Sequence, residues 1–249
     1  MKSFACFFSL AFFFATIVTA QNVITPTNHI ELFNGEDFSG FTFCMKNEAD
    51  PLKTWSVTNG VIHCNGAAVG YLRTKQSFQN YQLTVEWRFV KIAPKADNTG
   101  VLFHIQQPDK VWPMCVQFQG KHEHQGDLFL MAGAESKEHK GMDANTPVPL
   151  RYQAEKPVGD WNEVKIWCMN GIYTNGVSTS FITTFENNRP VNYTTDCTLT
   201  NGAIGIQSEG ADFEIRKISL DQAMVAPSYH GLPLGYTDIL DAQLRAAKP

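Results

Sequence analysis

Several short apolar segments of this chain carry polar side chains that could do chemistry. A carboxylate or an imidazole can take up a proton, a guanidinium can stabilise negative charge, and an amide donates and accepts hydrogen bonds. Glu86 and Arg88 lie two residues apart in one segment, and Gln117 and Gln119 lie two apart in a later one. Residues two apart in a strand project from the same face. Each pair therefore predicts a polar patch on one side of a sheet.

Two further polar residues accompany apolar runs. His104 lies within the run 101–105, and Glu209 follows the run 204–207. Taken one at a time, each of these residues is more simply interpreted as a solvated surface group. Polar and aromatic groups gathered on one concave sheet are nevertheless a common way to bind a sugar. A carbohydrate site on one face of a sheet is therefore a hypothesis that the fold can test.

The segments that must position these residues are short and rich in β-branched and aromatic residues. Residues 81–90 alternate most clearly, with Tyr81, Leu83 and Val85 on the apolar face. Asn59-Gly60 predicts a type I′ hairpin turn, because both residues accept positive φ, and Asn170-Gly171 gives the same signal. Turn residues recur about every ten positions, which predicts an all-β fold of two antiparallel sheets forming one sandwich.

The remaining stretches lack such alternation. Residues 134–159 are rich in Lys, Glu and Pro and predict a long surface loop. Near the end of the chain, residues 237–247 are amphipathic, which predicts a short helix capped by Thr237.

The first twenty residues are typical of a cleaved export signal. Lys2 supplies the positive charge, and residues 4–18 are nearly all apolar. The small residues expected before a cleavage site follow and end at Ala20. The apolar run is shorter than the roughly 20 residues that span a bilayer, so a retained anchor is the weaker alternative. We expect an exported protein, periplasmic or secreted, with no stable membrane insertion after residues 1–20 are removed and with a short linker at 21–29.

The charge balance and the cysteine count limit which partners the protein can bind and how its cysteines can pair. The 20 Lys and Arg residues are outnumbered by 24 Asp and Glu residues, without a long run of either sign, which argues against nucleic acid. Five cysteines follow the signal, so at least one thiol stays free within a chain. Cys115 and Cys168 lie in apolar segments and are expected to be buried, whereas Cys44 and Cys64 are a candidate disulfide.

Eight short segments then form an ordered series. They begin with Leu32-Phe33-Asn34-Gly35 and end with the run from Gly202 to Ile218, and the full set is 30–41, 55–62, 70–74, 81–88, 98–101, 112–127, 159–162 and 202–218. In this order they resemble the motifs of the 3-keto-disaccharide hydrolase family. The resemblance implies a concanavalin-like jelly-roll β-sandwich over residues 30–220, followed by a C-terminal extension at 221–249.

The resemblance also implies action on a carbohydrate substrate, a glycoside already oxidised to a ketone at carbon 3. Such a ketone acidifies the proton on carbon 2, so a base can remove it and the oxygen on carbon 1 can leave by β-elimination before water adds. The candidates for proton transfer are Glu86, His104 and Glu209. The candidates for substrate binding are Arg73, Arg88, Asn98, Gln117 and Gln119. Arg73 or Arg216 could instead pair structurally with Glu86 or Glu209.

One departure from the family pattern favours other functions. Gln117 stands where the family usually has Glu, and an amide cannot move a proton at neutral pH. A non-catalytic carbohydrate-binding sandwich is therefore the alternative, and a structural or adhesive surface domain is a third hypothesis.

A divalent metal is a candidate cofactor, with His122, His124 and Asp127 as ligands and His139 as a further donor. Their spacing matches no defined metal motif, so a solvated loop is the simpler interpretation. Asn192-Tyr193-Thr194 fits an N-glycosylation sequon, which has meaning only in a eukaryotic secretory pathway.

Overall fold

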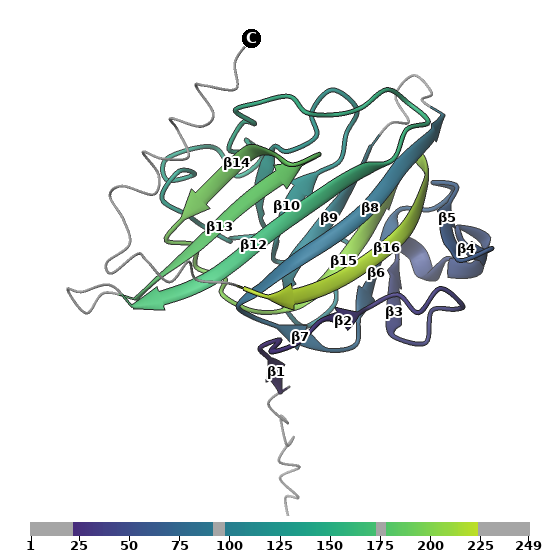
Figure 1. Cartoon of the computed structure of the whole chain (residues 1–249), viewed down its shortest axis with the longest axis horizontal. Coiled ribbons are helices and arrows are strands. Elements are labelled where there is room, and N and C mark those ends of the chain that lie inside the picture. The colour runs from purple at the N-terminus through teal and green to yellow at the C-terminus, as the bar shows by residue number, and fades with distance from the viewer. Residues whose placement is uncertain (1–21, 92–97, 173–177, 224–249) are drawn as a thin grey trace, which may run out of the picture.

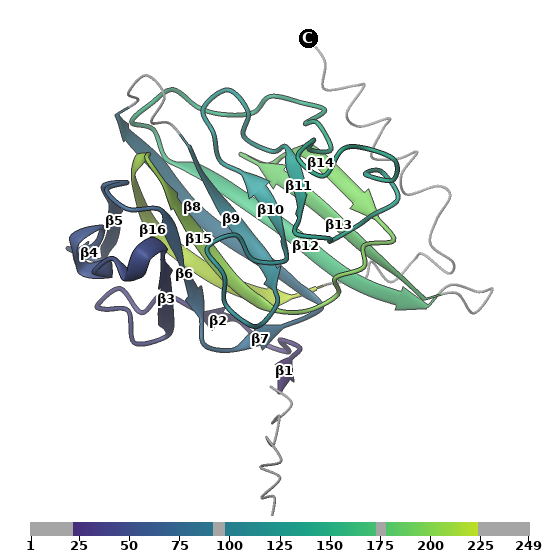
Figure 2. The same cartoon turned by 180° about the vertical axis from the view of Figure 1, so that it is seen from behind.

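Two antiparallel sheets face each other across the protein, as the computed structural model of residues 22–91, 98–172 and 178–223 shows (Figures 1 and 2). The six-stranded sheet has the order β11 (Leu128–Met131), β10 (Cys115–Gln119), β9 (Asn98–Ile105), β15 (Ala203–Glu209), β6 (Gly70–Thr74) and β3 (Phe41–Met45). The eight-stranded sheet has the order β14 (Arg189–Thr195), β13 (Ser178–Glu186), β12 (Asn162–Ile172), β8 (Tyr81–Lys91), β16 (Asp212–Gln222), β5 (Val61–Cys64) and β4 (Trp55–Thr58), with β2 (Ile30–Glu31) also paired to β16.

Shorter elements lie at the edges of the sandwich (Figure 1). β1 (Val23–Ile24) pairs in parallel with β7 (Ser77–Phe78), and two 3-10 turns, η1 (Lys46–Glu48) and η2 (Pro51–Lys53), lie between β3 and β4. No helix among the described residues is long and apolar enough to cross a membrane.

The core lies between the two sheets and follows the alternation of β8. Its residues Tyr81, Leu83, Val85, Trp87 and Phe89 are all buried, as predicted. Trp87 packs edge-on against Phe213 with ring centroids 6.3 Å apart. Burying one such large apolar side chain contributes about 1.5–3 kcal/mol to stability. The fold class predicted from the sequence, an all-β sandwich of two antiparallel sheets, is confirmed.

Of the two predicted turns, one is right and one is wrong. β4 and β5 form a hairpin around Asn59-Gly60, whose φ angles are 54° and 77°. Asn170-Gly171 makes no turn, because β12 continues through both residues and keeps pairing with β13 as far as Ile172 and Ser178. The long loop predicted at 134–159 contains no named strand or helix and lies between β11 and β12. The expected signal peptide and terminal helix lie outside the described residues.

The cysteines remain thiols. Cys44, Cys64, Cys115, Cys168 and Cys197 are all free, so the candidate disulfide is wrong. The two side chains lie in different environments, because Cys44 packs against a separate cluster that contains Tyr71 and Leu102, whereas Cys64 belongs to the core between the sheets. Cys115 and Cys168 are fully buried, as expected of small apolar residues.

The interior beside β13 and β14 is unusually polar. Asn192 is buried and donates from its Nδ2 to the carbonyl oxygens of Gly126 and Val148, both at 2.9 Å. The side-chain amide of Asn192, which a glycan would modify, is therefore buried and hydrogen-bonded in the folded protein.

Glu186 pairs across the strands with Val164, a core residue, so its side chain also lies on the inner face.

Glu186 makes the stability of this region depend on pH. Both of its carboxylate oxygens are buried without a hydrogen-bond partner among the described residues. Burial, reinforced by the nearby Glu155 and partly offset by Lys156, raises the pKa of Glu186 from 4.5 to about 8. The folded protein therefore keeps a proton that the unfolded chain releases. The resulting stabilisation is complete below the unfolded pKa and is lost as the pH rises through the folded pKa.

We expect Glu186→Gln to flatten the fall in unfolding free energy between about pH 5 and pH 8, because the amide does not titrate. Urea unfolding at several pH values measures this slope. Glu163→Gln is the control, since Glu163 lies partly exposed beside Lys165, with Oε1 2.6 Å from the ammonium nitrogen. Identical slopes in Glu186→Gln and the unaltered protein would contradict the assignment.

Candidate functional site

A cavity of about 530 Å³ opens on the six-stranded sheet. Its strand residues alternate with Val101, Val116 and Phe118, which belong to the core, so the cavity lies on the face turned away from the other sheet. The lining consists of polar strand residues and of more apolar residues from the edge strand and the loops: Asn98, Trp112, Gln117, Gln119, Phe129, Met131, Ala132, Ala144, Asn145, Gln207 and Glu209.

Three buried glutamines form the polar floor of the cavity. Gln117 donates from its Nε2 to Oε1 of Gln119 at 2.7 Å and to Oε1 of Gln207 at 3.3 Å. Gly100 lies between them, opposite Gln119 on β10 and Gln207 on β15. A Cβ atom at Gly100 would lie 2.7 Å from Nε2 of Gln117. The missing side chain at Gly100 is what lets the amides meet across β9. We call Gln117, Gln119 and Gln207 the glutamine ladder.

Glu209 is the one ionisable residue among the described residues that line the cavity. Asn98, its partner in register on β9, donates from Nδ2 to Oε2 of Glu209 at 2.7 Å. Partial burial raises the pKa of the Glu209 carboxyl above its usual value of 4.5, because low dielectric disfavours the charged form. The geometry thus presents one carboxyl suited to accepting a proton at the edge of a row of neutral amides.

The side of the cavity next to Gln117 is apolar. Trp112, which is 45% exposed, comes from the loop between β9 and β10, and Phe129 and Met131 come from the edge strand β11. Amides beside aromatic side chains suit a sugar ring, which has hydroxyl groups at its rim and C–H groups on its faces.

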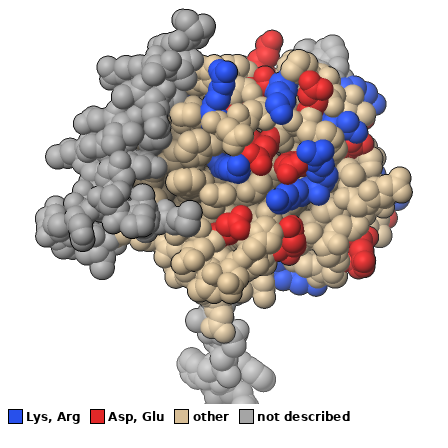
Figure 3. All heavy atoms as spheres, viewed as in Figure 1, with Lys and Arg blue, Asp and Glu red and all other residues tan. Residues whose placement is uncertain are grey.

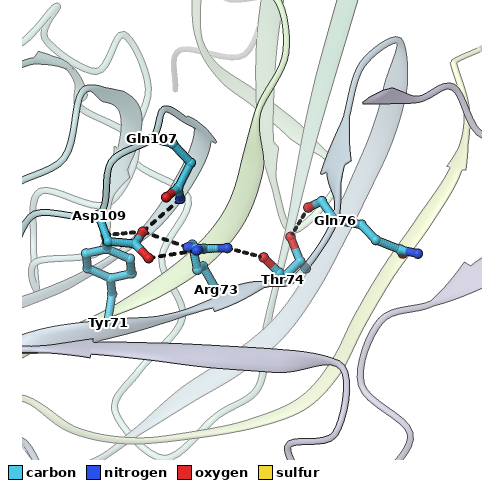
Figure 4. Close-up of polar contacts among 6 residues, drawn as sticks. All are labelled: Tyr71, Arg73, Thr74, Gln76, Gln107 and Asp109. Atoms are coloured by element: carbon cyan, nitrogen blue, oxygen red, sulfur yellow. Dashed lines mark hydrogen bonds and ion pairs between the residues drawn. The ribbon is translucent and has the colours of Figure 1, made fainter. Parts of the chain in front are cut away.

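The structure therefore brings together four of the candidate site residues predicted from the sequence: Asn98, Gln117, Gln119 and Glu209. Arg73 lies on the same sheet but does not line the cavity. Its guanidinium is bound to Asp109, with Nε–Oδ1 and Nη2–Oδ2 distances both of 2.7 Å (Figure 4).

Glu86 and Arg88 lie elsewhere, which corrects the prediction that they join the site. They belong to β8 in the eight-stranded sheet, so their polar face points away from the core on the opposite side of the protein. Glu86 binds Arg216 at 2.6 Å, which was the structural alternative, and Arg88 binds Glu214 at 2.7 Å. Figure 3 shows acidic and basic side chains interspersed on this face.

Simple alternation along β9 would place His104 on the outer face of the sheet, but the structure buries it in the core. The register between β9 and β15 shifts between Ala203 and Gly205, and His104 has a φ of 55°, so a bulge turns its side chain into the core. Its Nδ1 lies 3.0 Å from the carbonyl oxygen of Leu199, and its ring packs against Tyr81. Burial lowers the pKa of His104 to about 4, which keeps it neutral. His104 is a core residue and does not reach the cavity.

The candidate metal ligands do not gather at one point. His122 pairs with Glu155 at 2.7 Å, whereas His124 lies 3.4 Å from Asp127. His139 contacts the carbonyl oxygen of Thr146. Among the described residues, no group of three or more His, Cys, Asp or Glu side chains is arranged to hold a metal ion. His124 and Asp127 lie near each other, but His122 is paired with Glu155 and His139 with a backbone carbonyl, so the predicted ligand set does not come together.

Some lining residues escaped the sequence-based prediction. Gln207 lies two residues before Glu209 on one strand, so alternation alone could have placed both on the cavity face. Trp112 and Asn145 come from loops, and their approach to the sheet depends on the path of those loops. No periodic signal in the sequence could have found them.

Two sheets packed face to face, with an open cavity on the outer face of one, define a concanavalin-like β-sandwich protein. A sequence model of the 3-keto-alpha-glucoside-1,2-lyase-like domain matches residues 28–221, well over half of the chain, and the chain belongs to this family. The family membership makes it a carbohydrate-related, hydrolase-like domain.

One curated relative and several solved structures are similar to this chain. A 3-keto-disaccharide hydrolase of Bacteroides thetaiotaomicron is 22% identical over 182 residues, which cover 65% of this chain and 60% of that protein. A Parabacteroides distasonis protein proposed to be a glycosyl hydrolase shares 18% identity and a TM-score of 0.55, covering 78% of this chain and 94% of its own. A carbohydrate-binding module of Bacillus subtilis shares 11% identity and a TM-score of 0.50, with coverages of 74% and 97%. Both structural matches show a shared fold.

Gly100→Ala tests the glutamine ladder. The added methyl group would displace Gln117, so we expect unfolding free energy to fall by about 1–3 kcal/mol, as in other overpacked sites. Gly171→Ala on β12 is the matched control, because a Cβ atom there meets nothing within 4 Å, and it should change stability by less than about 0.5 kcal/mol. Chemical unfolding of both variants measures the difference. Equal stabilities would show that the space at Gly100 is not needed.

Proposed function

We propose that this protein is an exported enzyme that cleaves 3-keto-glycosides by β-elimination followed by hydration, in carbohydrate catabolism. The observation that carries the proposal is a single carboxyl, Glu209, set beside a row of preorganised amides in the cavity of a protein from this family. A glycosidase acting on an ordinary sugar uses two carboxyl groups across the scissile bond. A 3-keto-glycoside requires one base and donors for an enolate.

Glu209 serves as the base in this proposal. Its carboxylate takes the proton from carbon 2, the electrons of that C–H bond form the double bond between carbons 1 and 2, and the C1–O bond breaks. The proton now on Glu209 can pass to the departing oxygen, which leaves as an alcohol. Water then adds across the double bond. Because the pKa of Glu209 is raised by burial, the carboxyl is a stronger base than a solvated Glu and can also return the proton.

The glutamine ladder supplies the donors. Gln117 directs both hydrogen bonds to the oxygens of Gln119 and Gln207. The amide oxygens on either side are thereby occupied, and the NH₂ groups of Gln119 and Gln207 make no hydrogen bond with another described residue. In the proposed reaction these NH₂ groups hold the ketone oxygen as it gains negative charge. Gln117 itself orients its neighbours and moves no proton.

We expect Glu209→Gln to lower kcat at least about 100-fold, the usual contribution of a general base. In the unaltered protein kcat/KM should rise with pH through a pKa above the ordinary Glu value of 4.5, because the base must be ionised. Initial rates on a 3-keto-disaccharide across the pH range measure both effects. Glu163→Gln, outside the cavity, controls for the loss of one charge. An undiminished rate in Glu209→Gln would remove Glu209 as the base.

A non-catalytic carbohydrate-binding domain is the second candidate, and Gln117 at the family's usual Glu position favours it. Incubation of the purified protein with a 3-keto-disaccharide separates the two functions. For the enzyme we expect release of the second sugar, detected by chromatography, together with loss of substrate. Binding measured by calorimetry, without any released sugar, would instead support the binding domain.

A further inference from the structure

The loop between β9 and β10 carries Trp112, one of the aromatic residues that line the cavity, but it makes few backbone hydrogen bonds of its own. A hydrogen bond from the backbone N–H of Gln106 to the carbonyl oxygen of Met114, at 2.9 Å, closes its base. Within the described residues, no backbone hydrogen bond reaches residues 107–113. Trp112 lies in this stretch and lines the cavity. Side-chain contacts must therefore hold Trp112 at the cavity.

Arg73 reaches this loop from β6, a strand on the far side of β15. In register, Arg73 lies opposite Gly205 on β15, and Gly205 lies opposite Leu102 on β9. A Cβ atom at Gly205 would lie 3.4 Å from Cβ of Arg73. The glycine therefore leaves room on the cavity face beside Arg73, and the guanidinium extends to Asp109 in the loop (Figure 4).

The contact is a two-pronged ion pair with further support. Nε and Nη2 of Arg73 bind the two oxygens of Asp109 at 2.7 Å each, and Nη1 donates to the carbonyl oxygen of Thr74 at 2.9 Å. Oδ1 of Asp109 also accepts from the Tyr71 hydroxyl at 3.2 Å and from Nε2 of Gln107 at 3.0 Å. We call Arg73, Asp109 and Tyr71 the loop clamp. All three guanidinium nitrogens of Arg73 are bonded to Asp109 or to the Thr74 carbonyl oxygen, and Arg73 does not line the cavity.

The electrostatics keep the loop clamp charged. The Arg73 side chain is 11% exposed and that of Asp109 31%, so solvent screens the pair less than an open surface pair. Partial burial raises the pKa of Asp109, but the hydrogen bonds from Arg73 and Gln107 outweigh it and hold that pKa below its usual range. A planar guanidinium matches a carboxylate at two points, whereas a lysine ammonium makes a single contact.

We propose that Arg73 and Asp109 are a positioning pair that fixes Trp112 as the sugar-stacking wall of the cavity. Arg73 acts through the loop and does not touch the substrate. This proposal rests on the cavity being the sugar site of the proposed function. It assigns substrate affinity to an ion pair outside the cavity and leaves proton transfer to Glu209.

The test is Arg73→Lys, which keeps the charge and removes the two-pronged geometry. The matched control is Arg88→Lys, which alters an Arg–Glu pair of the same 2.7 Å length on the opposite sheet. With a 3-keto-disaccharide we expect Arg73→Lys to raise KM about tenfold and to change kcat less than about twofold, the pattern of lost uniform binding. Arg88→Lys should leave both constants unchanged. Asp109→Asn should reproduce the effect of Arg73→Lys.

The same substitution in a Trp112→Ala background separates positioning from general stability. If Arg73 acts through Trp112, Arg73→Lys should add less than about a twofold change in KM once the indole is gone, because the two effects are coupled. A full tenfold loss in the Trp112→Ala background, or no loss in the unaltered background, would overturn the proposal.

A readout that needs no substrate distinguishes failure of this proposal from failure of the proposed function. Hydrogen exchange at the backbone amide of Gln106, whose bond to Met114 closes the loop, should be faster in Arg73→Lys than in the unaltered protein and in Arg88→Lys. If the unaltered protein neither binds nor cleaves the sugar, the proposed function fails, and so does the role assigned to Trp112 in binding. If sugar is bound but loop exchange and KM match those of the control, the positioning pair is the part that is wrong.

Discussion

Burial of one face of every strand is the constraint on which the rest of the structure depends. Each sheet of the sandwich uses its inner face for the core, where β8 places Trp87 against Phe213 of the neighbouring strand. Only one face of each sheet then remains for polar residues, and the two free faces lie on opposite sides of the protein. A polar strand residue can therefore reach the cavity only if its strand belongs to the six-stranded sheet and its register points outward.

The outer face of the eight-stranded sheet carries ion pairs, whereas the cavity on the six-stranded sheet is lined mostly by uncharged residues. On the eight-stranded sheet, Glu86 with Arg216 and Arg88 with Glu214 form partly exposed ion pairs, which contribute little stability individually. On the six-stranded sheet, the cavity floor is built from neutral amides around Gly100, and Glu209 is the ionisable residue beside them. Neutral donors can be buried at lower cost than charges once they are hydrogen-bonded to one another. The hydrogen-bonded amides of this floor are therefore held in place before a ligand binds, at a lower desolvation cost than buried charges would have.

Arginine serves different purposes on the two faces. Arg88 and Arg216 both lie over the ring of Trp161, at 4.6 and 4.5 Å from its centroid, and hold an outer surface together. Arg73 uses its fork to join a strand to a loop that lies beside the cavity. The type of residue is the same in each case, and only its neighbours across the sheet decide whether it stabilises a surface or shapes a binding site.

Local sequence patterns were enough to predict the fold class, the apolar face of β8 and the hairpin at Asn59-Gly60, because alternation and turn propensity are local properties. The sequence also identified Asn98, Gln117, Gln119 and Glu209, which the structure places in one cavity. Local patterns could not show that Glu86 lies on the eight-stranded sheet, away from the cavity. Each strand is assigned to its sheet by pairing with strands that are distant in sequence. Tertiary structure also decided that His104 faces the core, since a one-residue bulge reverses the alternation. The position of Trp112 depends on Asp109 meeting Arg73 from 36 residues away, a contact that no local pattern encodes.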